Sequence, residues 1–197
     1  MCLVGITATL FDVNMTTAPS QQAHPAGYLS RWRERRRERL RLARQDRLAA
    51  QLAELHHIQT LIADARTLVA SGWVQDGWFA YRDERGQQHI VRGMNLHGMA
   101  DRPVTGACLV GAIAHAGGGL AALRTAPVQG ALDVTWRTLY RDQHEPGHWC
   151  PVPTVRTNHV RDLTRWNDDP GRLLDEVTAL LHTAEQTAAA EIARLRA

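Results

Sequence analysis

The sequence contains no lysine, so all 23 of its basic side chains are arginines. It has only three cysteines, Cys2, Cys108 and Cys150, and none of them forms a CxxC pair. This odd number disfavours a disulfide framework, and we expect free thiols in a reducing, cytoplasmic compartment. The apolar stretch from Met1 to Val13 is too short to span a bilayer and lacks the basic start of a signal peptide. We therefore expect no membrane partner.

Recognisable catalytic and cofactor motifs are also missing. The sequence has no GxxxxGK[ST], GxSxG, HExxH or EF-hand pattern, so we predict no catalytic residue and no cofactor, and a non-enzyme is favoured. His144, His148, Cys150 and His159 could supply zinc ligands, but their spacing, H-x3-H-x-C-x8-H, matches no zinc-binding pattern. We predict no metal. An unfamiliar active site among the many His, Asp and Glu residues remains open.

Positive charge is concentrated in one segment. Nine arginines and only three acidic residues lie between Ser30 and Arg47, so this segment carries +6 in a chain of +3 overall. At about 100° per residue these arginines point in every direction around a helix and leave no apolar stripe. We therefore predict a solvated helical arm that extends beyond the core. Its predicted nucleic-acid-binding residues are Arg31, Trp32, Arg33, Arg35, Arg36, Arg37, Arg39, Arg41, Arg44 and Arg47.

Two functions suit such an arm. In the first, the protein is an accessory factor whose arginines neutralise phosphates of DNA or RNA, with Trp32 stacking on a base or sugar. In the second, the arm docks on an acidic protein partner or on a second copy of the chain. A third interpretation is a solvated helix in which Glu34 pairs with Arg37 and Glu38 pairs with Arg41. The oligomeric state stays open.

The chain is expected to have three parts. Residues 1–27 form a flexible tail, residues 28–47 form the arm, and residues 48–197 form a single, mainly α-helical domain with a minor β-hairpin. A chain of 197 residues with 44% hydrophobic content suits one core.

Local patterns predict the elements of this domain. They are a helix from Leu29 to Ser71 capped by Gly72, hairpin strands at Trp78 to Tyr81 and Gln88 to Val91, and helices at Val104 to Ala116 and Gly130 to Arg141. A loop follows over residues 142–157. The last helix begins with Asp169 as N-cap and Pro170 as first residue, and turns Leu173 inward. The predicted core contains Leu52, Leu55, Ile62, Val69, Cys108, Val110, Ile113, Trp166, Val177, Leu180 and Leu181.

Three short motifs occur in order along the domain. They are Leu68-Val69-Ala70-Ser71-Gly72-Trp73, then Cys108-Leu109-Val110-Gly111-Ala112, then Trp166-Asn167-Asp168 followed by Pro170, Arg172, Glu176 and Val177. Over about residues 50 to 190 the chain resembles a small actinobacterial-type domain family of unknown function. The resemblance implies a helix ending in Gly-Trp, a Cys-x-x-Gly-Ala helix and a Trp-Asn-Asp turn into a final helix. It implies no activity. The arm and the long segment from Leu120 to Arg165 depart from the family pattern.

The third motif allows two interpretations. Trp166, Asn167, Asp168 and Arg172 could line a pocket, but Asp-Asp-Pro before an amphipathic run is also what the start of a capped helix needs. We favour the structural interpretation. Cys108 lies in an apolar stretch, where burial raises a thiol pKa, so we expect a buried and unreactive packing residue.

Overall fold

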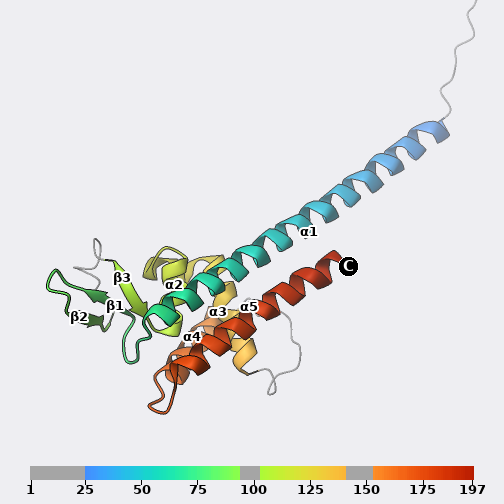
Figure 1. The fold of residues 1–197 in the computed structure, drawn as a ribbon. Helices are drawn as coiled ribbons and strands as arrows, with labels where there is room; N and C mark the ends of the chain where they lie inside the picture. Colours follow the sequence, from blue (N-terminus) through green and yellow to red (C-terminus); the bar gives the residue numbers. More distant parts are fainter. Residues whose placement is uncertain (1–24, 94–102, 141–152) are drawn as a thin grey trace, which may run out of the picture. The chain divides into compact units, whose positions relative to one another are not determined.

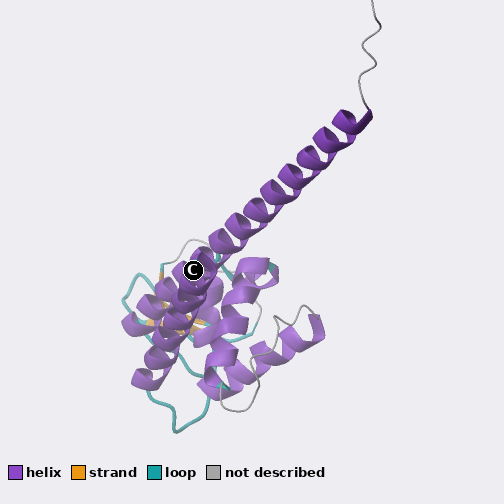
Figure 2. Ribbon diagram, turned by 90° about the vertical axis from the view of Figure 1, so that its right-hand side faces the viewer, coloured by secondary structure: helices purple, strands orange, loops and turns teal. Residues whose placement is uncertain are grey.

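The fold was obtained as a computed structural model, which describes residues 25–93, 103–140 and 153–197 (Figure 1). The chain divides into two units, residues 1–44 and residues 45–197. The described helices are α1 (Pro25–Ser71), α2 (Leu109–Ala116), the short 3-10 helix η1 (Leu120–Arg124), α3 (Ala126–Leu139), α4 (Pro153–Asn167) and α5 (Leu174–Arg196). The strands are β1 (Phe79–Arg82), β2 (Gln88–Val91) and β3 (Val104–Ala107). Helices dominate the described chain, and the strands form a small patch (Figure 2). The predicted mainly α-helical fold with a minor hairpin is confirmed.

Helix α1 ends where the sequence predicts, at Ser71, but begins earlier, at Pro25. Proline suits a first helical turn because its missing N–H would have no partner there. The Gly72 amide closes the helix by donating to the carbonyls of Leu68 and Val69, each at 3.2 Å. The boundary between the two units lies inside α1, after Arg44, and so before the end of the predicted arm at Arg47.

The sheet is antiparallel with the order β2-β1-β3. The hairpin β1–β2 agrees with the prediction, but the helix predicted over Val104 to Ala116 is wrong in its first part, which forms β3. Only Leu109–Ala116 is helical. The whole stretch is apolar and small, and such a run has no periodicity that separates a buried strand from a buried helix. Residues 104–107 form a strand because they pair with β1.

Helices and the sheet enclose one core in the second unit. Nine of the eleven predicted core residues are buried: Leu55, Ile62, Val69, Cys108, Val110, Ile113, Val177, Leu180 and Leu181. Leu52 and Trp166 are only half-buried. Helix α5 runs antiparallel to the second part of α1. The Arg66 Nη2 and Glu185 Oε2 atoms are 3.2 Å apart, and the Arg196 Nη2 and His56 Nε2 atoms are 2.8 Å apart.

Two predictions near the end of the chain are wrong. The predicted loop over residues 142–157 is helical from Pro153 onward, while residues 141–152 lie outside the described part. Asp169 does not cap the last helix, because α5 begins at Leu174 and Glu176 Oε2 accepts the Leu173 amide at 2.8 Å. Leu173 is 64% exposed instead of turned inward. Asp169 instead caps a turn, accepting the Gly171 amide at 2.9 Å.

Candidate functional site

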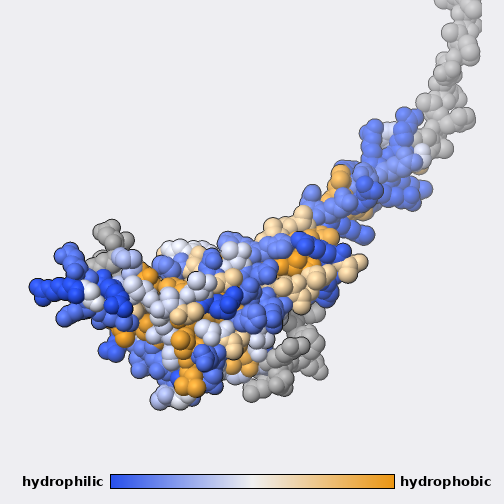
Figure 3. Space-filling view, viewed as in Figure 1, coloured by the Kyte–Doolittle hydropathy of each residue, from blue (hydrophilic) through white to orange (hydrophobic). Residues whose placement is uncertain are grey.

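The arm is a fully exposed stretch of helix. Every residue from 28 to 47 is exposed, and each is helical as part of α1. Trp32 is 45% exposed, and the guanidinium carbon of Arg36 lies 5.5 Å from the centroid of its ring. Arg41 Nε lies 3.6 Å from Glu38 Oε2, so one of the two predicted i,i+3 pairs is formed. In Figure 3 the arm is mostly hydrophilic, with scattered hydrophobic patches.

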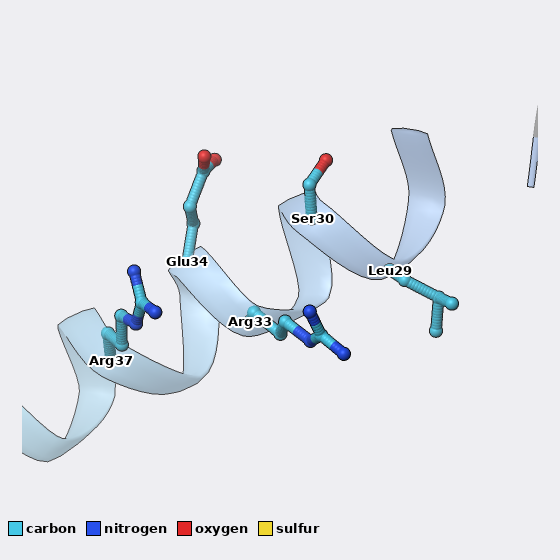
Figure 4. A pocket seen from close by; sticks show the side chains of 5 residues that line it. All are labelled: Leu29, Ser30, Arg33, Glu34 and Arg37. Atoms are coloured by element: carbon cyan, nitrogen blue, oxygen red, sulfur yellow. The ribbon is translucent and has the colours of Figure 1, made fainter. Parts of the chain in front are cut away.

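A shallow hollow runs along the beginning of the arm (Figure 4). Its lining residues, Leu29, Ser30, Arg33, Glu34 and Arg37, all come from α1. A hollow with walls from one helix cannot enclose a small molecule, since ligand pockets bury most of the ligand surface. Among the described residues, the arm therefore offers an exposed, charged helix surface and no enclosed small-molecule pocket.

Asn167 joins three segments of the domain. Its Oδ1 accepts from Trp73 Nε1 at 2.9 Å and from the Leu109 amide at 3.0 Å. Its Nδ2 donates to the Val74 carbonyl at 3.0 Å and to Asp168 Oδ1 at 2.7 Å. An asparagine side chain has two donors and about two acceptor positions, so all are used. Asn167 is completely buried and has nothing left to offer a ligand.

The residues around Asn167 complete this junction. The Asp76 amide donates to Asp168 Oδ1 at 3.1 Å, and Gln75 Nε2 donates to the Asp169 carbonyl at 2.8 Å. Arg172 lies over the Trp166 ring at 4.0 Å and pairs with Glu176 at 3.1 Å. Of the four residues named as a possible pocket, Asn167 and Asp168 form a hydrogen-bonded link between the end of α4 and the segment after α1, whereas Arg172 contacts Trp166 and Glu176.

The other two motifs meet the same junction. Gly72 and Gly106 pass so closely that a Cβ on Gly72 would lie 2.5 Å from the Thr105 carbonyl oxygen. Cys108 is the N-cap of α2, its Sγ accepting the Gly111 amide at 3.2 Å. Burial raises the pKa of the Cys108 thiol from 9.0 to about 12. Because the thiolate is the reactive form, this thiol is a packing and capping group.

A second buried polar cluster links α3 to α4. His159 Nδ1 and Asp133 Oδ1 are 2.8 Å apart, and both side chains are less than a tenth exposed. The His159 ring stacks on Trp136 at 4.0 Å, and Trp136 Nε1 donates to Asp162 Oδ2 at 3.2 Å. Sequence reasoning missed this pair, because the two residues are 26 positions apart and no local pattern connects them.

The other residues considered as zinc ligands, His144, His148 and Cys150, lie outside the described residues. Among the residues that the structure does describe, no three His, Cys, Asp or Glu side chains gather as metal ligands would. In the same part of the chain, no helix has the length and apolarity needed to cross a membrane.

The fold and these sites define a small helical domain with a buried polar junction, preceded by a basic helical arm. The family model described as "Family of unknown function (DUF6197)" matches residues 53–187, and the chain belongs to this family. Comparisons with curated proteins and with solved structures found no significant match.

The range matched by the family model includes one candidate site and excludes the other. All three motifs that meet at Asn167 lie inside residues 53–187, whereas the arginine arm, residues 28–47, lies before it. The three motifs within the matched range therefore correspond to a structural junction of the domain. A function carried by the arm would be a property of this chain beyond the matched domain.

Proposed function

We propose that the protein is a non-enzymatic accessory factor that binds nucleic acid through the phosphate contacts of its arginine arm. The observation that carries this proposal is a net charge of +6 over residues 30–47, displayed on an exposed helix. Guanidinium groups make forked contacts to phosphate oxygens, and each neutralised phosphate releases condensed counterions. A reducing, cytoplasmic location is part of the proposal, supported by the free thiol of Cys108.

The arm also carries charge repulsion that a polyanion would relieve. Arginines stand four residues apart at Arg31 and Arg35, at Arg33 and Arg37, at Arg35 and Arg39, and at Arg37 and Arg41. Like charges at this spacing destabilise a helix by roughly 0.2–0.5 kcal/mol per pair. A row of phosphates would replace this repulsion by attraction, so binding and helix stability favour each other.

The test is the salt dependence of binding to DNA and RNA. Replacing Arg35, Arg36, Arg37 and Arg39 by Gln is expected to flatten the log–log slope by roughly three to four units, at about 0.9 per lost duplex phosphate contact. The matched control replaces four exposed domain arginines, Arg85, Arg124, Arg161 and Arg165, by Gln. It removes the same charge and should leave the slope unchanged.

Each result has a clear meaning. A parent protein without salt-dependent binding, or an arm variant that binds as well as the parent, overturns the proposal. The second function predicted from the sequence, docking of the arm on an acidic protein or a second copy, then becomes the better account. Equal losses in the arm variant and the domain control would show that overall charge, not the arm, attracts the nucleic acid.

A further inference from the structure

The charges on the arm are not evenly distributed around the helix. At about 100° per residue, Glu34 and Glu38 fall on the same side, because residues four apart are neighbours on a helix surface. The nine arginines cover the remaining directions. In Figure 4 the side chain of Glu34 points away from that of Leu29. The arm therefore has one acidic ridge, Glu34 and Glu38, and its third acidic residue, Asp46, lies near the end of the arm and off this ridge, about 80–120° around the helix from it.

A different kind of surface lies opposite this ridge. Leu29, Trp32, Arg36 and Leu40 recur at spacings of three and four residues, so they share one face of the helix. Leu29 is 54% exposed, Trp32 is 45% exposed and Leu40 is 53% exposed. An aromatic ring and an arginine on one exposed face are residue types enriched in the cores of interfaces. We call these four residues the Trp32 face.

We propose that the arm lies in the major groove of double-stranded DNA, with the Trp32 face toward the groove floor and the acidic ridge toward solvent. This inference rests on the proposed function. The B-form major groove is about 12 Å wide and admits an α-helix of about 10–12 Å diameter. Phosphates then flank the helix on both sides, where the arginines lie. The open side of the groove is the one place where Glu34 and Glu38 meet no phosphate.

Other nucleic acids fit this distribution less well. The major groove of A-form RNA is too narrow and deep for side chains to read its bases. A flat polyanionic surface would contact one side of the helix and leave the arginines on the other side unused. On the groove floor, Arg36 has the forked geometry that matches the O6 and N7 atoms of guanine, and Leu40 offers an apolar contact to thymine methyl groups. With Arg36 on a base, the fourfold arm variant loses three phosphate contacts, so its salt slope should flatten by roughly three units.

Two leucines provide a matched test of this orientation. Leu40 and Leu42 are 53% and 47% exposed, and a separation of two residues places them on nearly opposite sides of the helix. Leu42 stands four residues after Glu38, on the side of the acidic ridge. Leu40→Glu and Leu42→Glu therefore add the same charge to the same helix, one on the Trp32 face and one near the ridge.

We expect Leu40→Glu to weaken binding of the full chain to a short DNA duplex by about tenfold or more, and Leu42→Glu by less than about threefold. The same sequence as an RNA duplex should bind the parent at least about tenfold more weakly than DNA. Circular dichroism of both variants verifies that helix content is unchanged.

The outcomes separate this inference from the proposed function. If the parent binds duplex DNA but the two variants lose affinity equally, the orientation is wrong while nucleic-acid binding stands. Equal binding of the RNA and DNA duplexes also overturns the groove assignment. If the parent binds neither duplex, the proposed function itself fails, and the inference fails with it.

Discussion

Two arginine–tryptophan pairs show how differently the arm and the domain use the same residues. In the domain, Arg172 lies 4.0 Å from the Trp166 ring centroid, donates to the Trp166 carbonyl and pairs with Glu176. In the arm, Arg36 stands 5.5 Å from Trp32 on an exposed helix. Arg172 therefore stabilises the fold through contacts within the chain. Arg36 is exposed, so its forked donors are accessible to an external partner.

Polar side chains in the arm and in the domain differ in the same respect. The buried polar side chains of the domain, such as Asn167 and His159, are bonded within the protein, because an unsatisfied group in a core costs free energy. The arm is under no such constraint, since water solvates every side chain. Substitutions in the domain should therefore change stability, and substitutions in the arm should change binding.

The largest effect on stability is expected from Asn167→Ala. The change leaves the Leu109 amide, the Val74 carbonyl and the Trp73 indole N–H without their partner, and should lower the free energy of unfolding by about 3–5 kcal/mol. Urea denaturation measures it. Asn158→Ala is the control, because Asn158 is an exposed residue of the same helix, α4, and should cost under about 0.5 kcal/mol. A loss below about 1 kcal/mol at Asn167 would contradict the role of the junction.

A smaller loss is expected at the link between α3 and α4. His159→Phe keeps a ring against Trp136 but removes the nitrogen that bonds Asp133, so it should cost about 2–3 kcal/mol. Thermal unfolding of His182→Phe provides the comparison, since His182 is exposed on α5. If both variants melt alike, the buried Asp133–His159 bond contributes nothing net to stability.

Alkaline pH tests the burial of Cys108. Its pKa is raised from 9.0 to about 12 in the folded protein, so between these values the unfolded chain loses a proton that the folded chain keeps. The unfolded state then binds fewer protons, and stability falls as pH rises, by up to about 1.4 kcal/mol per pH unit. Cys108→Ala should show a shallower decline over the same range. Identical pH dependence in the two proteins would mean that the thiol is accessible.

The smallest effect on stability is expected in the arm. Replacing Arg35, Arg36, Arg37 and Arg39 by Gln should change the free energy of unfolding of the domain by less than about 0.5 kcal/mol, because these side chains are exposed. The melting temperature of the variant provides the measurement. A large decrease would show that the arm supports the domain, and the separation of binding from stability would no longer hold.

Long periodic segments were the most predictable part of the fold. The second part of α1 and the inward face of α5 carry apolar residues at helical spacing, and Ile62, Val69, Val177 and Leu181 are buried as predicted. Helix α4 was missed because buried positions on it are occupied by His159 and Asn167, which interrupt the apolar pattern. Strand β3 was missed because its residues suit either kind of element.

The two candidate sites also differ in how far the sequence could predict them. The arm was predictable because it depends on composition and helix geometry, which a local sequence contains in full. The group Trp166, Asn167, Asp168 and Arg172 contains Asn167 and Asp168, which form the junction with the segment after α1. The segments that it joins could not be foreseen, because the partners of Asn167 include Trp73, which is 94 positions away.

The amino-acid sequence by itself determined the charge of the arm, the helical periodicity of α1 and α5, and the three short motifs that lie within the range matched by the family model. Only the tertiary structure decided that these motifs meet at Asn167, that Val104–Ala107 pairs with β1, and that Asp133 bonds His159. The physical reason is the range of the interactions. Periodicity and charge act between neighbours along the chain, whereas a buried polar group is satisfied by whichever distant segment packing brings to it.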